Sequence, residues 1–148
     1  MTVTIRPLDI KDEARWRELW AGYLEFYKIP DLDPKTTDNT WAMLCGARDD
    51  VFGLVAEVDG RVVGLVHGVV HANTWVATPV CYLEDLFVDP GARGHGAGRA
   101  LVDAVVARAQ ANGLAQVYWR TADDNPARKL YDQLATKIDF VTYVRKLT

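Results

Sequence analysis

A glycine-rich turn, Arg93-Gly94-His95-Gly96-Ala97-Gly98, separates two stretches of the chain with different character. Residues 82–88 form an apolar run typical of a buried strand, and residues 98–112 have the apolar spacing of an amphipathic helix. Such a junction forms an anion site, because closely spaced backbone N–H groups point outward and the helix dipole favours negative charge. Glycine also lets the backbone approach a phosphate without a Cβ in the way. The sequence therefore predicts a strand–loop–helix unit that binds a phosphate-bearing ligand.

The spacing of this turn excludes two familiar phosphate loops. A Walker A loop requires Lys and then Ser or Thr after its last glycine, whereas Ala97 and Gly98 stand there. A dinucleotide fingerprint, G-x-G-x-x-G, would place Arg99 or Leu101 where its third glycine belongs. The pattern that fits is R-x-x-G-x-G, beginning at Arg93. An ordinary glycine-rich turn between a strand and a helix is the structural alternative.

The length and composition of the chain predict one globular domain, residues 1–148, because nearly half of the residues are apolar and a quarter are charged. A net charge of −3 with dispersed Lys and Arg argues against nucleic acid as a partner. Apolar stretches are shorter than a membrane span and residues 1–7 do not resemble a signal peptide. We therefore expect a cytoplasmic protein with no membrane partner.

Cysteine and histidine usage argues against a disulfide and against a metal site. Cys45 and Cys81 lie far apart in the sequence, and we expect both to be reduced thiols. His67, His71 and His95 lack the spacing of metal-ligand motifs, so no metal is expected. His67 and His71 lie four residues apart on a predicted strand, but without carboxylate support we expect them to be incidental.

Hydrophobic periodicity and turn residues predict the order of the elements. Strands are expected at residues 3–7, 52–58, 61–70, 81–88, 115–121 and 140–147, with a hairpin turn at Asp59-Gly60. Helices are expected between Asp12 and Tyr27 and at residues 40–46, 98–112 and 125–134. This order describes a mixed α+β fold, with a mostly antiparallel sheet, helices on both faces and a βαβ crossover at the glycine-rich turn.

The match to a known family extends beyond the turn. Residues 82–90, continuing into residues 93–98, resemble the spermidine/spermine and thialysine branch of the GNAT superfamily of N-acetyltransferases. Residues 117–121 and 128–131 are similar to a related branch whose members acetylate histones or free amino acids. The resemblance spans essentially the whole chain and implies the GNAT fold and acetyl-CoA as the cofactor.

The resemblance also implies where coenzyme A binds. The pantetheine arm would pair with the backbone of the strand before the turn, at Leu86, Phe87 and Val88. The pyrophosphate would lie on the amides of Arg93, Gly94, His95, Gly96, Ala97, Gly98 and Arg99. Asn125 and Arg128 are further candidate contacts to the cofactor. Family members commonly carry Asn at the position of Asp124, so either Asp124 or Asn125 takes its place.

Acetyl transfer to an amine requires a base, because a Lys-like amine has a pKa of about 10.4 and is protonated at neutral pH. Glu84 is the best candidate, since Glu84 and Asp85 lie in an otherwise apolar strand, where carboxylates are costly. Neighbouring strand residues face opposite sides, so both can reach one site only if the strand bulges there. A cross-strand ion pair is the structural alternative for Glu84. The resemblance makes Tyr131 the acid that protonates the departing thiolate, with a core tyrosine as the alternative.

Acidic and aromatic residues predict the acceptor. Asp31 and Asp33 lie in a loop that forms one wall of the acceptor pocket in such folds, and with Glu84 and Asp85 they would attract a cationic amine. Tyr27 and Trp75 are candidates to line the same pocket. We therefore expect a small-molecule amine as substrate: a polyamine, a lysine-like amino acid or an aminoalkyl compound.

Three alternatives to this interpretation follow from the same residues. A lysine in a protein, as in histone-type acetylation, is the alternative acceptor, and a noncatalytic acyl-CoA-binding module is the alternative class. Transfer through Cys81 is disfavoured, because nothing in the sequence marks this thiol as activated.

Relatives are usually dimers that pair through C-terminal strands, so a homodimer involving Val141, Tyr143 and Val144 is expected.

Overall fold

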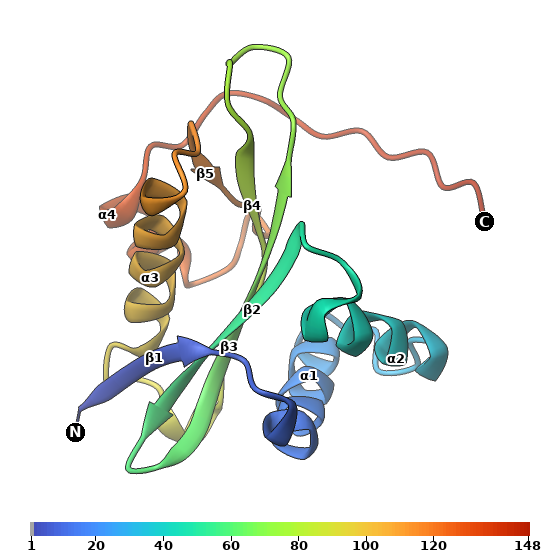
Figure 1. Cartoon of the computed structure of the whole chain (residues 1–148), viewed down its shortest axis with the longest axis vertical. Coiled ribbons are helices and arrows are strands. Elements are labelled where there is room, and N and C mark those ends of the chain that lie inside the picture. The colour runs from blue at the N-terminus through green and yellow to red at the C-terminus, as the bar shows by residue number, and fades with distance from the viewer. Residues whose placement is uncertain (1) are drawn as a thin grey trace.

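The computed structural model describes residues 2–148 and contains one sheet with helices on both faces (Figure 1). The strands are β1 (Val3–Pro7), β2 (Val51–Val58), β3 (Arg61–His71), β4 (Val80–Val88) and β5 (Val117–Tyr118), in that spatial order. Neighbouring strands from β1 to β4 are antiparallel, and β5 is parallel to β4. The predicted mixed α+β fold with a βαβ crossover is confirmed.

Two helices cover one face of the sheet and one long helix covers the other. α1 (Glu13–Phe26) and α2 (Pro34–Ala42) lie on the first face, preceded by a 3-10 turn (Ile10–Asp12) and followed by a π-helical turn (Met43–Ala47). α3 (Ala97–Ala111) lies on the second face, after a 3-10 turn (Pro90–Ala92), and α4 (Arg128–Leu134) follows β5. No helix within residues 2–148 is long and apolar enough to cross a membrane.

The second helix begins earlier than the sequence pattern predicted, at Pro34 rather than near residue 40. The cause is local, because the Asp33 carboxylate accepts a hydrogen bond from the backbone N–H of Lys35 at 2.9 Å. Proline at the first helical position has a backbone already suited to the helix. The loop between α1 and α2 is therefore shorter than expected, and it holds the two helices close together.

The core divides into two clusters, one on each face of the sheet. On the α3 face, Leu101 and Val105 of α3 pack against Val66 of β3, and all three are fully buried. On the α1 face, Trp16 of α1 packs with Leu65 of β3, and both are fully buried. The alternation of neighbouring residues on β3 between the two clusters is the period-two pattern of a strand buried on both faces.

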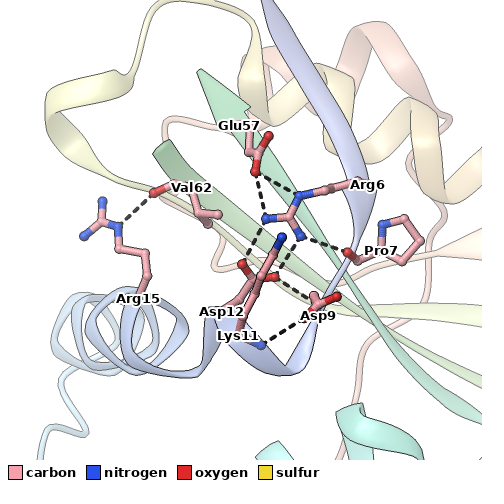
Figure 2. Close-up of polar contacts among 8 residues, drawn as sticks. All are labelled: Arg6, Pro7, Asp9, Lys11, Asp12, Arg15, Glu57 and Val62. Carbon is pink, nitrogen blue, oxygen red and sulfur yellow. Dashed lines mark hydrogen bonds and ion pairs between the residues drawn. The ribbon is translucent and has the colours of Figure 1, made fainter. Parts of the chain in front are cut away.

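An ion network fixes the start of α1 against the sheet (Figure 2). The two terminal nitrogens of the Arg6 guanidinium donate to the two carboxylate oxygens of Asp12, at 2.8 and 2.9 Å, and Nε donates to Glu57 at 2.9 Å. Two residues into α1, Arg15 Nε donates to the carbonyl oxygen of Val62 at 2.8 Å. These contacts join β1, β2, β3 and α1, and they orient the helix that covers the candidate site.

The predicted last strand, residues 140–147, is absent from the structure, and β5 is shorter than the expected 115–121. Beyond α4 the described chain contains neither strand nor helix and runs away from the sheet (Figure 1). A strand needs a partner edge, and the two residues of β5 offer too little of one. The apolar residues of this segment are therefore left exposed, with Tyr143 93% and Leu147 90% accessible.

Candidate active site

A bulge in β4 shapes the site. Asp85 pairs with His67 and Leu83 pairs with Gly68, so Glu84 is an extra residue without a partner on β3. The extra residue changes which side chains face which helix: Leu83 packs on the α3 face, yet Phe87, four residues further on, packs on the α1 face. The bulge that both carboxylates needed in order to face one site is therefore present.

Glu84 and Asp85 line the same cavity, which has a volume of about 300 Å³ and lies between the sheet, α1 and α2. Trp20 and Tyr23 of α1 form an aromatic wall, with their rings stacked 5.0 Å apart. Away from β4 the lining is formed by apolar side chains from the loop after α1 and from the turn after α2, together with Thr40 near the end of α2. The cavity therefore has an acidic end at β4 and an apolar end between the helices.

A chain of buried hydrogen bonds holds Asp85 in the cavity wall. Trp16 Nε1 donates to His67 Nε2 at 3.0 Å, and His67 Nδ1 contacts Asp85 Oδ2 at 2.8 Å. The three residues are 0%, 3% and 8% exposed. An indole N–H can only donate, so Nε2 is an acceptor and the proton of the neutral imidazole lies on Nδ1, where it donates to the carboxylate. His67 therefore fixes the position of the Asp85 carboxylate by a hydrogen bond, and as a neutral ring it does not cancel the negative charge.

The expectation that His67 is incidental was wrong, because Asp85 supplies the carboxylate support. The pairing of these two residues depends on the register of β3 against β4 and on the bulge at Glu84. No spacing in the sequence predicts that register. Trp16 on the neighbouring helix is only a weak signal that His67 has a hydrogen-bond partner. Among the described residues, no group of three or more His, Cys, Asp or Glu side chains is placed to hold a metal ion.

Burial raises the pKa of three side chains in and beside the cavity. Partial burial, and next the Asp85 carboxylate, raise the pKa of Glu84 above its usual value, although Glu84 reaches solvent at the cavity mouth. Burial raises the pKa of the Tyr23 hydroxyl far above its usual range, and the Asp85 carboxylate adds to this. Burial also raises the pKa of Tyr131. Both phenols are therefore protonated at neutral pH, and Glu84 is a stronger base than an exposed glutamate.

The glycine-rich turn has the backbone of an anion site. Gly94 and Gly96 have φ values of +86° and +82°, the left-handed region that favours glycine. α3 begins directly afterwards at Ala97, and no side chain of residues 2–148 caps this helix. The first N–H groups of α3 are therefore available to an anionic ligand.

Side chains around the turn secure it to its neighbours. Arg93 Nε donates to the Val88 carbonyl at 3.0 Å, and its guanidinium lies 5.5 Å from the ring centre of Phe87. Arg99 on α3 reaches the carboxamide of α4 residue Gln133 at 3.3 Å. His95 is exposed at the tip of the turn. The structure thus brings the predicted pyrophosphate residues together around one open loop.

The edge of β4 next to the turn lacks a strand partner over most of its length. β5 pairs with β4 only through Val117 and Tyr118, opposite Cys81 and Tyr82. Within the described chain, residues 83–88 of β4 therefore have an open edge on the β5 side. This edge contains the predicted pantetheine-binding residues Leu86, Phe87 and Val88, and it leads from the cavity to the glycine-rich turn.

Tyr131 lies on α4, which follows β5 and contacts α3 through Gln133 and Arg99. Its ring is partly buried and packs edge-on against Trp119, with ring centres 5.6 Å apart. Burial raises the pKa of Tyr131, and Tyr27 adds to this.

Asn125 and Arg128 shape the turn into α4. Asn125 Oδ1 accepts from the backbone N–H of Ala127 at 2.9 Å, and its Nδ2 donates to the Thr121 hydroxyl at 2.8 Å. Arg128 Nη1 donates to the Asp123 carboxylate at 2.9 Å. Both side chains are already hydrogen-bonded within the chain, so in this structure they stabilise the turn into α4.

Most of the predicted acceptor residues lie outside the cavity, and only Asp85 of the five lines it. Asp31 is exposed in the loop after α1, and Asp33 is engaged in capping α2. Trp75 is 83% exposed in the loop between β3 and β4. Tyr27 is one residue beyond α1 and packs on the outer side of the aromatic wall, 4.9 Å from Tyr23.

Comparison with known proteins places the chain among acetyltransferases. The sequence model of the acetyltransferase (GNAT) family matches residues 14–135. A D-amino-acid N-acetyltransferase of Saccharomyces cerevisiae is 33% identical over 146 residues, which cover 97% of this chain and 90% of that protein. An aminoglycoside N(6')-acetyltransferase type 1 of Stenotrophomonas maltophilia is 36% identical over 109 residues, covering 70% and 65%.

Solved structures show the same fold. AAC(6')-Iy in complex with a bisubstrate analogue, CoA-S-monomethyl-acetylneamine, superposes on this chain with a TM-score of 0.84. The match covers 100% of both chains at 22% sequence identity. At that identity the likeness concerns the arrangement of helices and strands.

Proposed function

Because the chain belongs to the GNAT family of acetyltransferases, we propose that it transfers the acetyl group of acetyl-CoA to the primary amine of a small cationic acceptor. The observation that carries this proposal is the bulge in β4, which directs Glu84 and Asp85 into one cavity. That cavity meets the open edge of β4, along which the cofactor would lie. The amine and the thioester would therefore be brought together beside Glu84.

Coenzyme A would bind along the open edge of β4 and end on the glycine-rich turn. The backbone of Leu86, Phe87 and Val88 would pair with the pantetheine arm, and the amides of residues 93–99 would hold the pyrophosphate. An edge amide near Leu86 would polarise the thioester carbonyl as an oxyanion-hole donor does. Asn125 and Arg128 would act indirectly, by fixing the turn that positions α4.

Glu84 would act as the base. An amine with a pKa of about 10.4 is almost fully protonated at pH 7. Forming its unprotonated, nucleophilic state at this pH costs about 4–5 kcal/mol. Glu84, whose raised pKa makes it a better proton acceptor, would remove the proton directly or through water. The amine nitrogen then attacks the thioester carbon, the new C–N bond forms, the C–S bond breaks, and the nitrogen releases its second proton to solvent. Tyr131 would donate its proton to the departing thiolate.

Direct attack is favoured over an acetyl-cysteine intermediate. Cys81 is buried and packs in the cluster on the α3 face, whereas Glu84 and Asp85 face the cavity on the α1 face. Burial raises the pKa of the Cys81 thiol, so little of the nucleophilic thiolate is present. The thiol is therefore neither placed nor activated for acetyl transfer.

Two copies of the chain would form a homodimer through residues 136–148. Phe140, Val141, Tyr143 and Val144 are 72–93% exposed, which is unusual for apolar side chains so close in sequence. β5 pairs on one edge only within the described residues, so a segment from a second copy has a strand to extend. Pairing of the two segments would bury these side chains.

The experiment that tests the function measures thiol release from acetyl-CoA over a panel of primary amines, together with CoA binding by calorimetry. The panel includes polyamines, basic and aromatic amino acids, arylalkylamines, aminoglycosides and a lysine-containing peptide. We expect amine-dependent thiol release with a small amine preferred over the peptide. Tight CoA binding without turnover on any amine would instead identify a noncatalytic acyl-CoA-binding module.

A further inference from the structure

The two ends of the cavity differ in charge. The acidic end contains Glu84 and Asp85, and the apolar end contains Leu32, Met43 and Leu44. Among the residues that line the cavity in the described chain, none is Lys or Arg. The lining therefore has two candidate partners for one ammonium group and no Lys or Arg to neutralise a carboxylate.

Asp85 has no Lys or Arg partner among the described residues that line the cavity. Its hydrogen-bond partner, His67, is neutral because His67 Nε2 accepts from the indole N–H of Trp16. The pair consequently carries a net negative charge in a buried wall, where the Tyr23 hydroxyl also interacts with the carboxylate but no Lys or Arg of the cavity lining pairs with it. An ammonium group in the cavity would offset this charge. The stacked rings of Trp20 and Tyr23 lie beside it and add a surface that attracts cations.

The apolar end limits what the ammonium group can be attached to. A second ammonium, as in a polyamine, would be desolvated against Leu32 and Met43 without a carboxylate partner. The carboxylate of an amino acid would lie within the same small cavity as Glu84 and Asp85, with no cation to neutralise it. A cavity of about 300 Å³ is at the small end for ligand sites and fits one ring with a short chain.

We propose, on the basis of the acetyltransferase function above, that the acceptor is an arylalkylamine or a branched alkylamine without a carboxylate. Its ammonium group lies on Asp85, and its apolar body lies between Trp20, Tyr23 and the aliphatic end. His67 is a positioning residue that holds the carboxylate. This acceptor differs from the D-amino acid named for the yeast relative, which carries a carboxylate that the lining here does not neutralise.

The test compares kcat/KM for matched pairs of acceptors with the wild-type chain: 2-phenylethylamine against D- and L-phenylalanine, and 3-methylbutylamine against putrescine. We expect the monoamine without a carboxylate to be preferred in each pair by about 100-fold or more, because a site rejects a group that it leaves unpaired. Preference for an amino acid or for putrescine would overturn this inference while leaving the acetyltransferase function intact. No turnover on any amine would contradict the function itself.

A variant that gains activity toward another acceptor tests the placement of the acceptor, because a folding defect cannot produce such a gain. Met43→Lys places an ammonium group at the apolar end, and we expect it to raise kcat/KM for phenylalanine relative to 2-phenylethylamine by about 10-fold or more. Ala42→Lys adds the same charge on the exposed neighbouring residue and should leave the ratio unchanged. Asp85→Asn should raise the KM for the amine more than it changes kcat or the affinity for CoA. An unaltered ratio in Met43→Lys together with an unaltered KM in Asp85→Asn would refute the placement of the acceptor.

Discussion

Glu84 and Asp85 are neighbours in the chain but have different surroundings. Asp85 is buried and held by His67, whereas Glu84 reaches solvent at the cavity mouth. A group that exchanges protons during each turnover needs access to water, and a group that holds a charge in place benefits from a fixed hydrogen bond. The proposed division between a base and an ammonium-binding residue follows from this difference.

Glu84→Gln removes the proposed base while preserving the size of the side chain. We expect the rate near pH 7 to fall by about 100-fold to 10,000-fold, the usual contribution of a general base. The loss should shrink as the pH rises, because the unprotonated amine becomes more abundant as the pH approaches its pKa of about 10.4. The measurement is the pH dependence of kcat/KM, with Glu25→Gln on the exposed side of α1 as a matched control. A constant ratio of variant to wild type from pH 6 to 10 would exclude Glu84 as the base.

At the scale of elements, the turn between β4 and α3 depends on the backbone. Gly96 is the residue before α3 and has a φ of +82°, where an L side chain is strained by about 1–2 kcal/mol. Gly91 in the preceding 3-10 turn has no positive φ, and an added Cβ would meet only the Asp89 carboxylate, at 3.7 Å. The two glycines therefore differ in how much they tolerate a side chain.

Gly96→Ala should weaken CoA binding by about 10-fold, since the strain corresponds to roughly one factor of ten in an equilibrium constant and falls on the loop that holds the pyrophosphate. Gly91→Ala should bind CoA as the wild type does. Isothermal titration calorimetry with CoA measures both. Equal affinities for the two variants would contradict the assignment of the turn as the pyrophosphate site.

Asp12→Asn tests the contact between β1 and α1. Hydrogen bonds from Arg6 lower the pKa of Asp12, so the carboxylate stabilises the fold above the unfolded-state pKa of about 3.9 and this stabilisation is lost as the pH falls through the lower folded-state pKa. We expect the variant to lower the free energy of unfolding by about 2 kcal/mol at pH 7, and by less below pH 4. Denaturant unfolding at several pH values measures this, with Asp38→Asn in an exposed pair as control. A deficit that does not depend on pH would contradict the ion-pair explanation.

Local signals in the sequence predicted the order of most elements, but they did not predict which residues pair across the fold or that residues 140–147 form no strand. The turn at Gly94 and Gly96 and the start of α3 were predictable because a few neighbouring residues decide them. The need for a bulge was also predictable from two adjacent carboxylates in an apolar strand. The partnership of His67 with Asp85 was not, because it depends on strand register, which only the packed sheet fixes.

At the scale of the whole molecule, the exposed segment after α4 is the part of the chain that the fold leaves incomplete. Its sequence has the apolar content of a strand, yet the described structure gives it no strand partner. A strand pattern encodes the tendency to pair but not the partner, which explains why residues 140–147 were predicted as a strand and are not one here. A second copy of the chain supplies an equivalent segment and an equivalent β5 edge.

Removal of residues 136–148 should therefore convert a dimer into a monomer. Light scattering coupled to size-exclusion chromatography measures the mass of the full chain and of the shortened variant. Tyr143→Lys with Val141→Lys should have the same effect without shortening the chain, because charges would be buried at the interface. A full chain that stays monomeric at high concentration would refute the dimer.

The placement of the acceptor in the cavity beside the β4 bulge is tested most directly by a crystal structure with a bisubstrate analogue. The analogue joins CoA through an acetyl linker to the amine with the highest kcat/KM in the panel. We predict that its pyrophosphate lies on the amides of residues 93–99. The amine nitrogen should lie beside Glu84 and Asp85, with the amine's body between Trp20 and Tyr23. An analogue whose amine portion lies outside this cavity, with the cavity empty, would contradict the proposed site.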